Sequence, residues 1–311
     1  MGTRADRSRG LAAGGAAHLL WAVFPLYFEL LDQASAVEVV AHRICWTLVF
    51  CLIGVTVRRA WGQARAVWAD KKLVARLALA GVLVSVNWLI YVWAILHDQV
   101  VDAALGYFIN PLVTVGLGLV VLRERLRRLQ YVALGVGLLA VVVIVIGYGH
   151  FPWVGLGLAL SFAAYALMKN RVAAKVAPLV GLGLETFTLA PLALAGIVWL
   201  QLDGRGVFLG HGLGYTVGLA LTGVVTAVPL LLFAQAAGRI PLATLGLLQY
   251  ITPTGQFLIG LIWFHEAMPA ARWAGFGLIW VALILLSLQG LRSWRAHRRD
   301  PAADAGDGPL G

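Results

Sequence analysis

Ten long apolar runs, separated by short polar segments, constrain this chain more than any other feature of its sequence. Each run has about 20 residues, the length of helix that crosses the ~30 Å hydrocarbon core of a bilayer. Hydrophobic residues make up 61% of the 311 residues and charged residues only 12%, whereas soluble domains have about 25% charged residues. The sequence therefore predicts an all-α integral membrane protein with the lipid bilayer as its solvent. The ten predicted transmembrane helices are 10–31, 37–57, 73–96, 100–122, 129–148, 151–169, 179–201, 213–236, 241–264 and 271–290.

The basic residues predict how these helices cross the membrane. The net charge of +10 would suggest nucleic acid in a soluble protein, but here the basic residues lie between apolar runs, so we expect no nucleic-acid partner. With the N-terminus in the cytoplasm, all but three of the 24 lysines and arginines fall on the cytoplasmic side, as the positive-inside rule requires. The exceptions are Arg43, Arg205 and Arg272. We expect a multi-pass inner (plasma) membrane protein with a cytoplasmic N-terminus (1–9) and a basic, then disordered, cytoplasmic tail (291–311).

An internal repeat relates the two halves of the chain. The segment 105–124 aligns without a gap with the segment 247–266, at a constant offset of 142 residues (253 − 111). A proline and a glutamate at a fixed separation, flanked by matching glycines, are less readily explained by chance than a leucine periodicity. The sequence thus predicts two five-helix repeats, 10–148 and 149–290. The matching pairs are Pro111 with Pro253, Gly118 with Gly260, Glu124 with Glu266 and Gly135 with Gly277.

An odd number of helices in each repeat gives the two copies opposite orientations in the membrane. Inverted repeats of this kind are typical of secondary transporters, because two similar halves that exchange conformations convert an inward-open state into an outward-open one. Pro111 and Pro253 fall near the middle of corresponding spans, where each removes a backbone hydrogen bond and kinks its helix. Paired kinks indicate a central binding site. Packing kinks without a ligand role are the alternative.

Uncharged polar side chains within the apolar runs are candidates for that binding site, because polar groups are expensive in lipid. Their hydrogen-bonding tips and aromatic rings could together line a cavity for a small-molecule substrate. Hydrogen bonding between helices, without a ligand, is the alternative for each of them. The candidates are Asn87, Trp88, Tyr107, Asn110, Gln249, Tyr250 and Thr254, with Tyr91, Gln235 and Thr252 near them.

Charged and titratable side chains inside the apolar runs are more specific candidates for substrate contact or proton coupling. His42 and Arg43 lie about a turn and a half inside the second span and could contact substrate or a counter-charge, although Arg43 could also snorkel to the headgroups. Glu185 lies at a similar depth in the seventh span and could carry a coupling proton or only pair with a basic neighbour. His18 is expected to be a hydrogen-bonded histidine of the packed interior.

The remaining carboxylates and the cysteine thiols are expected to have structural roles rather than catalytic or binding roles. Glu124 and Glu266 end their predicted helices, where they are expected to bond backbone donors or arginines of the following loop. Cys45 and Cys51 are six residues apart, about 9 Å along a helix axis, which is too far for a disulfide. They are expected to be apolar filler. The sequence predicts no metal site and no cofactor.

Several segments resemble the RarD group of the EamA family, within the drug/metabolite transporter superfamily. The resemblance covers about residues 10 to 290. It implies a ten-helix 5+5 fold, cytoplasmic termini, a plasma-membrane location and export of small metabolites or drugs, with chloramphenicol sensitivity as the traditional label of the group. The segments are HRICW (42–46), NWLIYVWA (87–94), LGYFINPLV (105–113), RERLRRLQ (123–130), VPLLLFAQAA (228–237) and LGLLQYITPT (245–254).

Two positions depart from the pattern of this group. The fourth span of the family usually ends in Gly-Glu-Arg, whereas this chain has Arg123, Glu124 and Arg125. His18 stands where a neutral aromatic residue is expected, and its role in substrate choice or coupling stays open. Neither departure affects the expected fold.

The sequence favours a secondary active transporter over two other classes of membrane protein. A Walker motif is absent, so ATP is not the expected energy source. An intramembrane enzyme is the first alternative, but the chain has neither G-x-S-x-G nor H-E-x-x-H. A lipid scramblase or scaffold without solute transport is the second. The substrate, coupling ion and oligomeric state are not predicted, and a homodimer is left open.

Overall fold

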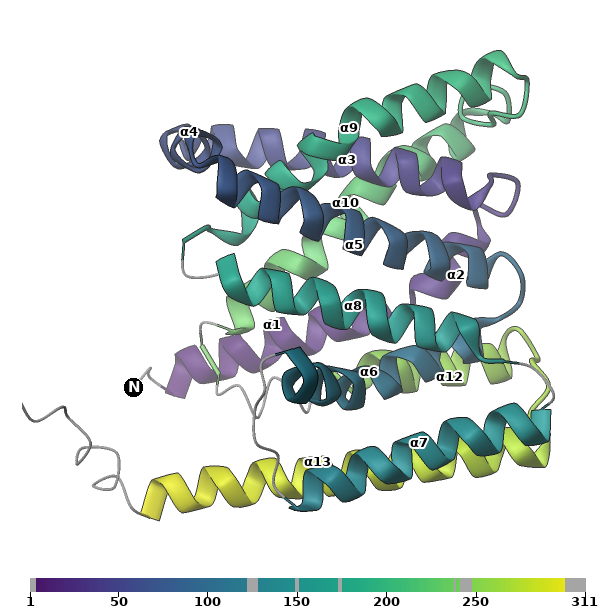
Figure 1. The fold of residues 1–311 in the computed structure, drawn as a ribbon. Coiled ribbons are helices and arrows are strands. Elements are labelled where there is room, and N and C mark those ends of the chain that lie inside the picture. Colours follow the sequence, from purple (N-terminus) through teal and green to yellow (C-terminus); the bar gives the residue numbers. More distant parts are fainter. Residues whose placement is uncertain are drawn as a thin grey trace, which may run out of the picture. The chain divides into compact units, whose positions relative to one another are not determined.

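The computed structural model of the chain describes residues 4–121, 128–148, 151–172, 175–237, 239–240 and 248–299. Every regular element within these ranges is a helix (Figure 1). The helices are α1 (Arg4–Ala22), α2 (Phe24–Glu29), α3 (Ala36–Val57), α4 (Trp61–Ala69), α5 (Lys71–Ile95), α6 (Val100–Val121), α7 (Arg128–Tyr148), α8 (Trp153–Val172), α9 (Pro178–Leu202), α10 (Leu213–Ala237), α12 (Ile251–Ile262) and α13 (Ala270–Arg299).

The helices agree with most of the predicted spans. Within the described ranges, seven helices are long and apolar enough to cross a membrane: those in α3, α5, α6, α7, α9, α10 and α13. Two shorter apolar helices, Trp153–Lys169 and Ile251–Ile262, lie within the predicted sixth and ninth spans. Residues 241–247 of the ninth span lie outside the described residues. The chain is therefore an all-helical, multi-pass membrane protein, while the total of ten spans stays a prediction.

The first predicted span is interrupted, and the prediction of one continuous helix over 10–31 is wrong. The break falls at Val23, between α1 and α2. Pro25 explains it, because proline has no backbone N–H and its ring clashes with the carbonyl of the residue four positions earlier, Trp21. The carbonyl of Trp21 instead accepts a hydrogen bond from the Gln256 side chain, 3.0 Å away.

Two further helical segments differ from the sequence prediction. The nine-residue helix α4 lies between the second and third predicted spans, where no helix was predicted. Helix α13 continues to Arg299, so the basic start of the predicted tail is helical. The rest of that tail, from residue 300, lies outside the described residues.

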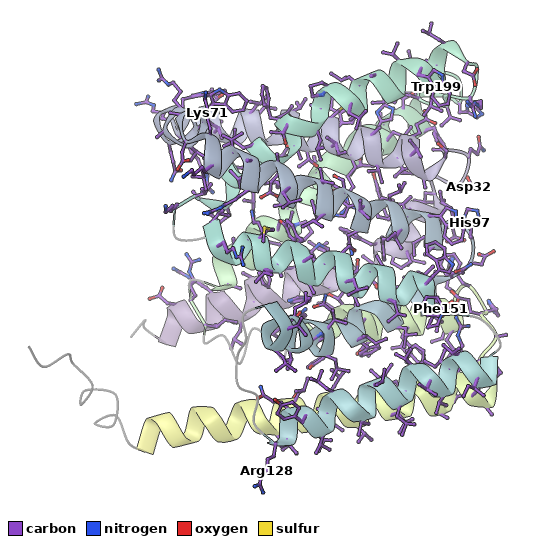
Figure 2. The ribbon with its side chains drawn as sticks, viewed as in Figure 1. Asp32, Lys71, His97, Arg128, Phe151 and Trp199 are labelled. Atoms are coloured by element: carbon purple, nitrogen blue, oxygen red, sulfur yellow. The ribbon has the colours of Figure 1, made fainter. Side chains whose placement is uncertain are left out.

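The chain divides into two compact units, each described here by itself. Unit one comprises Met1–Asn110 and Pro152–Ala267, and unit two comprises Pro111–Phe151 and Met268–Gly311. Unit one takes helices from both predicted repeats, and the repeats themselves stay a prediction. In Figure 2, Asp32, His97 and Trp199 lie at one end of unit one and Lys71 at the other, as alternate crossings of its helices require.

Unit one is built from helix pairs that lie far apart in the sequence. Helix α3 packs along α9 and α10, α5 packs along α8 and α9, and α1 packs along α10 and α12. The helices approach closely at glycines, which is how membrane helices gain packing contacts. A Cβ added to Gly223 of α10 would lie 2.5 Å from the Trp46 carbonyl oxygen of α3, and one added to Gly106 of α6 would lie 2.7 Å from the Gly155 carbonyl oxygen of α8.

Unit two contains the second half of α6, from Pro111, and two long helices, α7 and α13, which pack along each other. Glycine again stands at the contacts. A Cβ on Gly275 would lie 2.6 Å from the Ile144 Cδ1 atom. These two helices correspond to the predicted fifth and tenth spans.

Glu266 has the structural role expected from the sequence. Its carboxylate oxygens accept hydrogen bonds from the backbone N–H of Val101, at 3.0 and 3.1 Å. Val101 lies in the first turn of α6, where backbone N–H groups have no partner within the helix. Glu266 therefore caps a helix distant in sequence. Its predicted counterpart, Glu124, lies outside the described residues.

Candidate functional site

Arg43 lies at the centre of a cluster of aromatic side chains in unit one. Its side chain is buried, with 4% exposure, so it does not snorkel to the membrane surface. Its guanidinium carbon lies 4.2 Å from the ring centroid of Trp88 and 5.5 Å from that of Phe28, within cation–π range. The ring of Tyr91 lies 6.1 Å from that of Phe28, and the ring of Tyr107 lies 5.8 Å from that of Tyr91, centroid to centroid. The predicted candidates Arg43, Trp88 and Tyr107 therefore do come together.

A short hydrogen-bond chain fixes the orientation of the guanidinium. The Nε–H of Arg43 donates to the Thr226 hydroxyl at 2.7 Å, and that hydroxyl donates to the Thr222 carbonyl at 2.7 Å. The Nη1 atom of Arg43 is buried and has no hydrogen-bond partner among the described residues. The Nε side of the guanidinium is thus held by a hydrogen bond, while the Nη1 donor is available to a further hydrogen-bond acceptor.

His42 lies on a different face of α3, at the contact with the loop before α10. Its ring stacks on Phe208, with centroids 4.3 Å apart. One turn earlier, the buried Glu38 accepts hydrogen bonds from the backbone N–H groups of Val207 and Phe208, at 2.8 and 3.3 Å. Glu38 was not a candidate in the sequence, yet it holds this loop against the start of α3.

The two asparagine candidates bond between helices. Asn87 of α5 donates to the Leu158 carbonyl and to the Ser161 hydroxyl of α8, both at 3.0 Å. Asn110 of α6 donates to the Ala159 carbonyl of the same helix at 3.3 Å. Both side chains are buried. These contacts agree with the interhelical alternative for both residues.

A second polar contact joins α1 to α12. The Nδ1 atom of His18 lies 3.0 Å from the Thr252 hydroxyl, and that hydroxyl donates to the His18 carbonyl at 3.1 Å. His18 is buried, so the expectation of a hydrogen-bonded interior histidine is confirmed. One turn later, Gln256 donates to the Tyr91 hydroxyl at 3.0 Å and reaches the cluster around Arg43.

The remaining ninth-span candidates are less closely tied to this contact. Gln249 and Tyr250 are half-buried, and Thr254 is exposed on the side of α12 opposite Gln256. Pro253 lies in the first turn of α12, after a break at 249–250. A proline there removes no hydrogen bond, since first-turn N–H groups lack a partner in the helix. Pro111 lies inside α6, and the paired kinks at Pro111 and Pro253 stay a prediction, since residues 241–247 before the break lie outside the described residues.

Gln256 and Thr254 lie on opposite faces of α12, so substitutions at these two residues should differ in their effect on the free energy of unfolding. We expect Gln256→Leu to lower the free energy of unfolding by about 1–3 kcal/mol, because it leaves the Trp21 carbonyl and Tyr91 hydroxyl without their bond to Gln256. The exposed Thr254→Val should change it by less than about 0.5 kcal/mol. Denaturant titration of the purified protein measures both. Equal effects of the two substitutions would contradict this assignment of the faces.

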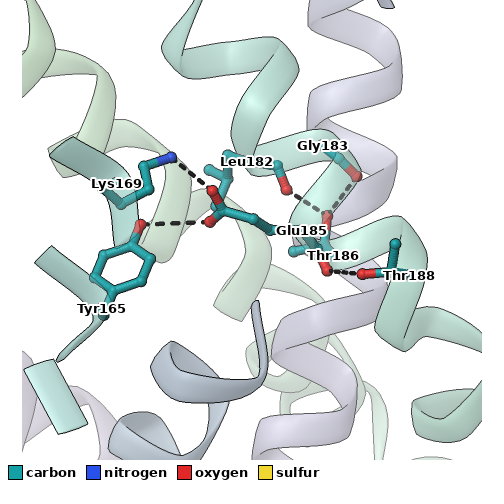
Figure 3. Close-up of polar contacts among 7 residues, drawn as sticks. All are labelled: Tyr165, Lys169, Leu182, Gly183, Glu185, Thr186 and Thr188. Carbon is teal, nitrogen blue, oxygen red and sulfur yellow. Dashed lines mark hydrogen bonds and ion pairs between the residues drawn. The ribbon is translucent and has the colours of Figure 1, made fainter. Parts of the chain in front are cut away.

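Glu185 of α9 forms a buried ion pair with α8 (Figure 3). Its Oε1 atom accepts a hydrogen bond from the Lys169 ammonium at 2.6 Å, and its Oε2 atom accepts one from the Tyr165 hydroxyl at 3.4 Å. Glu185 is 1% exposed and Lys169 29% exposed. The structure thus contains the pairing with a basic neighbour that was one of the two alternatives for Glu185, and the partner comes from the end of α8.

The residues missed from the sequence share one property, which is that their role depends on a partner in a distant helix. The sequence carried only a weak signal for Thr226 and Gln256. Each lies four residues after another polar residue, Thr222 and Thr252 respectively, and so on the same face of its helix. Both cysteines are free, as expected from their spacing.

Comparison with known proteins adds the family. The model of the EamA-like transporter family matches residues 8–146. Protein RarD of Streptomyces exfoliatus is 45% identical over 293 residues, covering 94% of this chain and 92% of the relative. The uncharacterized transporter YojE of Bacillus subtilis (strain 168) is 40% identical over 299 residues, covering 94% and 98%.

A solved crystal structure has a similar fold. It matches 91% of this chain and 98% of its own chain, with a TM-score of 0.59 and 17% sequence identity. At this identity the likeness concerns the fold alone. The sequence relatives are similar over nearly their full length and are named transporters or RarD. The chain thus belongs to the RarD group of the EamA family, in the drug/metabolite transporter superfamily, and is a membrane transporter of that type.

Proposed function

We propose that this chain is a secondary active transporter that exports small metabolites or drugs across the bacterial inner membrane by alternating access. Two inverted five-helix repeats supply the mechanism, with both termini in the cytoplasm. This proposal rests on the contacts between helices, which form the same pattern when each helix is replaced by its counterpart in the other half of the chain. A transporter of this kind needs two halves that can take up each other's conformation.

The helices of unit one support that symmetry. Helices α3 and α9 begin 142 residues apart (178 − 36), as do α5 and α10 (213 − 71), and α8 opens the second half as α1 opens the first. Exchanging each helix for its counterpart turns the α1–α10 contact into the α8–α5 contact. It turns the α3–α10 contact into the α9–α5 contact and leaves α3–α9 unchanged. All of these contacts are present.

Substrate export is tested by growth inhibition of a sensitive bacterial host that expresses the chain. The panel contains amphenicols, toxic amino-acid analogues and nucleoside analogues. We expect resistance to one of these classes, because a working exporter lowers the internal concentration of its substrate. Arg43→Ala should abolish the resistance at equal expression, and the exposed Arg58→Ala should retain it. Unchanged sensitivity to the whole panel counts against drug export.

Glu185 is the proposed carrier of a coupling proton. Reconstituted vesicles should show faster substrate flux with an imposed proton gradient, because a carboxylate that is neutralised by a proton no longer holds Lys169. We expect Glu185→Gln to remove this stimulation while leaving substrate exchange without a gradient. Asp98→Asn, a change at an exposed loop carboxylate, is the matched control. A Glu185→Gln variant that keeps full gradient stimulation assigns coupling to another group.

A further inference from the structure

We propose that Arg43 binds the carboxylate of a monoanionic substrate whose apolar or aromatic body lies against the surrounding rings. This inference rests on the transport function proposed above and names the chemical class of the substrate. The first observation behind it is that the positive charge of Arg43 has no counter-charge nearby in the part of the chain that the structure describes. Arg43 is buried, and the described residues place no aspartate or glutamate within ion-pair distance of it.

A buried charge without a counter-charge is unfavourable by several kcal/mol, and proteins normally pair it. Arg43 has a hydroxyl, Thr226, and the faces of aromatic rings, of which Trp88 is nearest. Both types of contact are favourable to a cation, but neither neutralises it. The unpartnered Nη1 donor shows where a further acceptor is missing.

The other half of the chain provides an internal comparison. Arg43 and Glu185 occupy equivalent positions of α3 and α9, since their numbers differ by the repeat offset of 142 (185 − 43). Glu185 has its counter-ion within the protein, because Lys169 lies 2.6 Å away. It is therefore already neutralised and does not serve Arg43. Of these two equivalent charges, the one on α3 is left for a partner from outside the chain.

The charge and shape of the site favour a carboxylate. One guanidinium neutralises one negative charge, so a monoanion gives a neutral complex, whereas a phosphate dianion would leave an unpaired charge in the membrane. Arginine presents parallel N–H donors that match the two oxygens of a carboxylate. Because Thr226 occupies Nε, the free donor is the terminal Nη1. Around it, the rings of Phe28 and Trp88 offer apolar surface for the body of the substrate.

The test uses purified full-length protein in a buffer free of carboxylates, phosphate and chloride, with binding followed by the shift of the thermal unfolding midpoint. The probes are phenylacetate, its neutral isostere phenylacetamide, phenyl phosphate and chloride. We expect phenylacetate to raise the midpoint and to bind about tenfold more tightly than any other probe. Arg43→Gln should lose this shift and Arg43→Lys should weaken it. Arg58→Gln, at the exposed C-terminal end of the same helix, should keep it.

A second measurement separates a binding role from a structural one. Without ligand, Arg43→Gln should unfold at the same temperature as the wild type or above it, because a lone buried charge has been removed. Equal shifts for phenylacetate and phenylacetamide, or for phenylacetate and chloride, overturn the proposal, as does a phenylacetate shift that survives in Arg43→Gln. A larger shift with phenyl phosphate overturns the choice of a carboxylate. If Arg43→Gln does not fold, the comparison of the four probes on the wild type decides alone.

The same protein in vesicles distinguishes this proposal from the transport function. Carboxylate-selective binding without any flux of phenylacetate contradicts transport but retains the site. Flux of neutral or cationic drugs without anion-selective binding retains transport and overturns the site.

Discussion

Gly223→Val is expected to abolish folding of this protein in the membrane. The β-carbon of valine would lie 2.5 Å from the Trp46 carbonyl oxygen and 2.7 Å from the Thr47 nitrogen. Both atoms belong to the backbone of α3, which cannot turn aside as a flexible side chain can. Overpacking ordinarily lowers stability by about 1–3 kcal/mol, and a clash with backbone should exceed that range. The readout is the yield of monodisperse protein after detergent extraction.

Gly214→Val is the matched control for this prediction. Gly214 lies in the first turn of the same helix, α10, and an added β-carbon there meets no atom within 4 Å. The control should be extracted in wild-type amounts. A normal yield of Gly223→Val would mean that α3 and α10 are further apart than described.

Lys169→Met is expected to lower the free energy of unfolding by about 3–5 kcal/mol, the range for breaking a buried ion pair. The substitution leaves Glu185, 1% exposed, with only the longer hydrogen bond from Tyr165. Glu185→Gln should have a smaller effect, because Lys169 is 29% exposed and can turn towards water. Denaturant titration of each variant gives the two values.

The double variant Lys169→Met/Glu185→Leu supplies the control, since an apolar pair of similar volume can replace a buried ion pair without loss of stability. It should recover most of the stability that Lys169→Met loses. If the loss in the double variant equals the sum of the losses of Lys169→Met and Glu185→Leu made singly, the residues act independently and the pair contributes little.

Long helices were predictable from the sequence because the residues that begin and end each helix are its neighbours in the sequence. Helix α3 was predicted at 37–57 and runs over Ala36–Val57, with Ser35 as an N-cap whose hydroxyl accepts from the Glu38 N–H. The break at Val23 was missed because Pro25 lies within an apolar run, and prolines are tolerated in membrane helices. Helix α4 was missed because nine residues are too few to give a transmembrane signal.

The candidate site was predictable as a set of residue types but not as a set of partners. The cost of polar groups in lipid singled out Arg43 and Glu185, and both are buried. Whether each is neutralised depends on a residue from another helix, Lys169 for Glu185 and Thr226 for Arg43. Choosing these partners requires the packing of helices in space, which a single sequence does not specify.

The uncompensated charge of Arg43 also bears on how the membrane voltage would act on this transporter. With a monoanion bound, the site is neutral, and the electric field exerts little force on the loaded protein. The empty site carries one positive charge, and an inside-negative voltage draws it inward with about 2.3 kcal/mol per 100 mV for full passage across the field. The voltage would then accelerate the return of the empty carrier, and each anion exported would appear as a unit of electrical current.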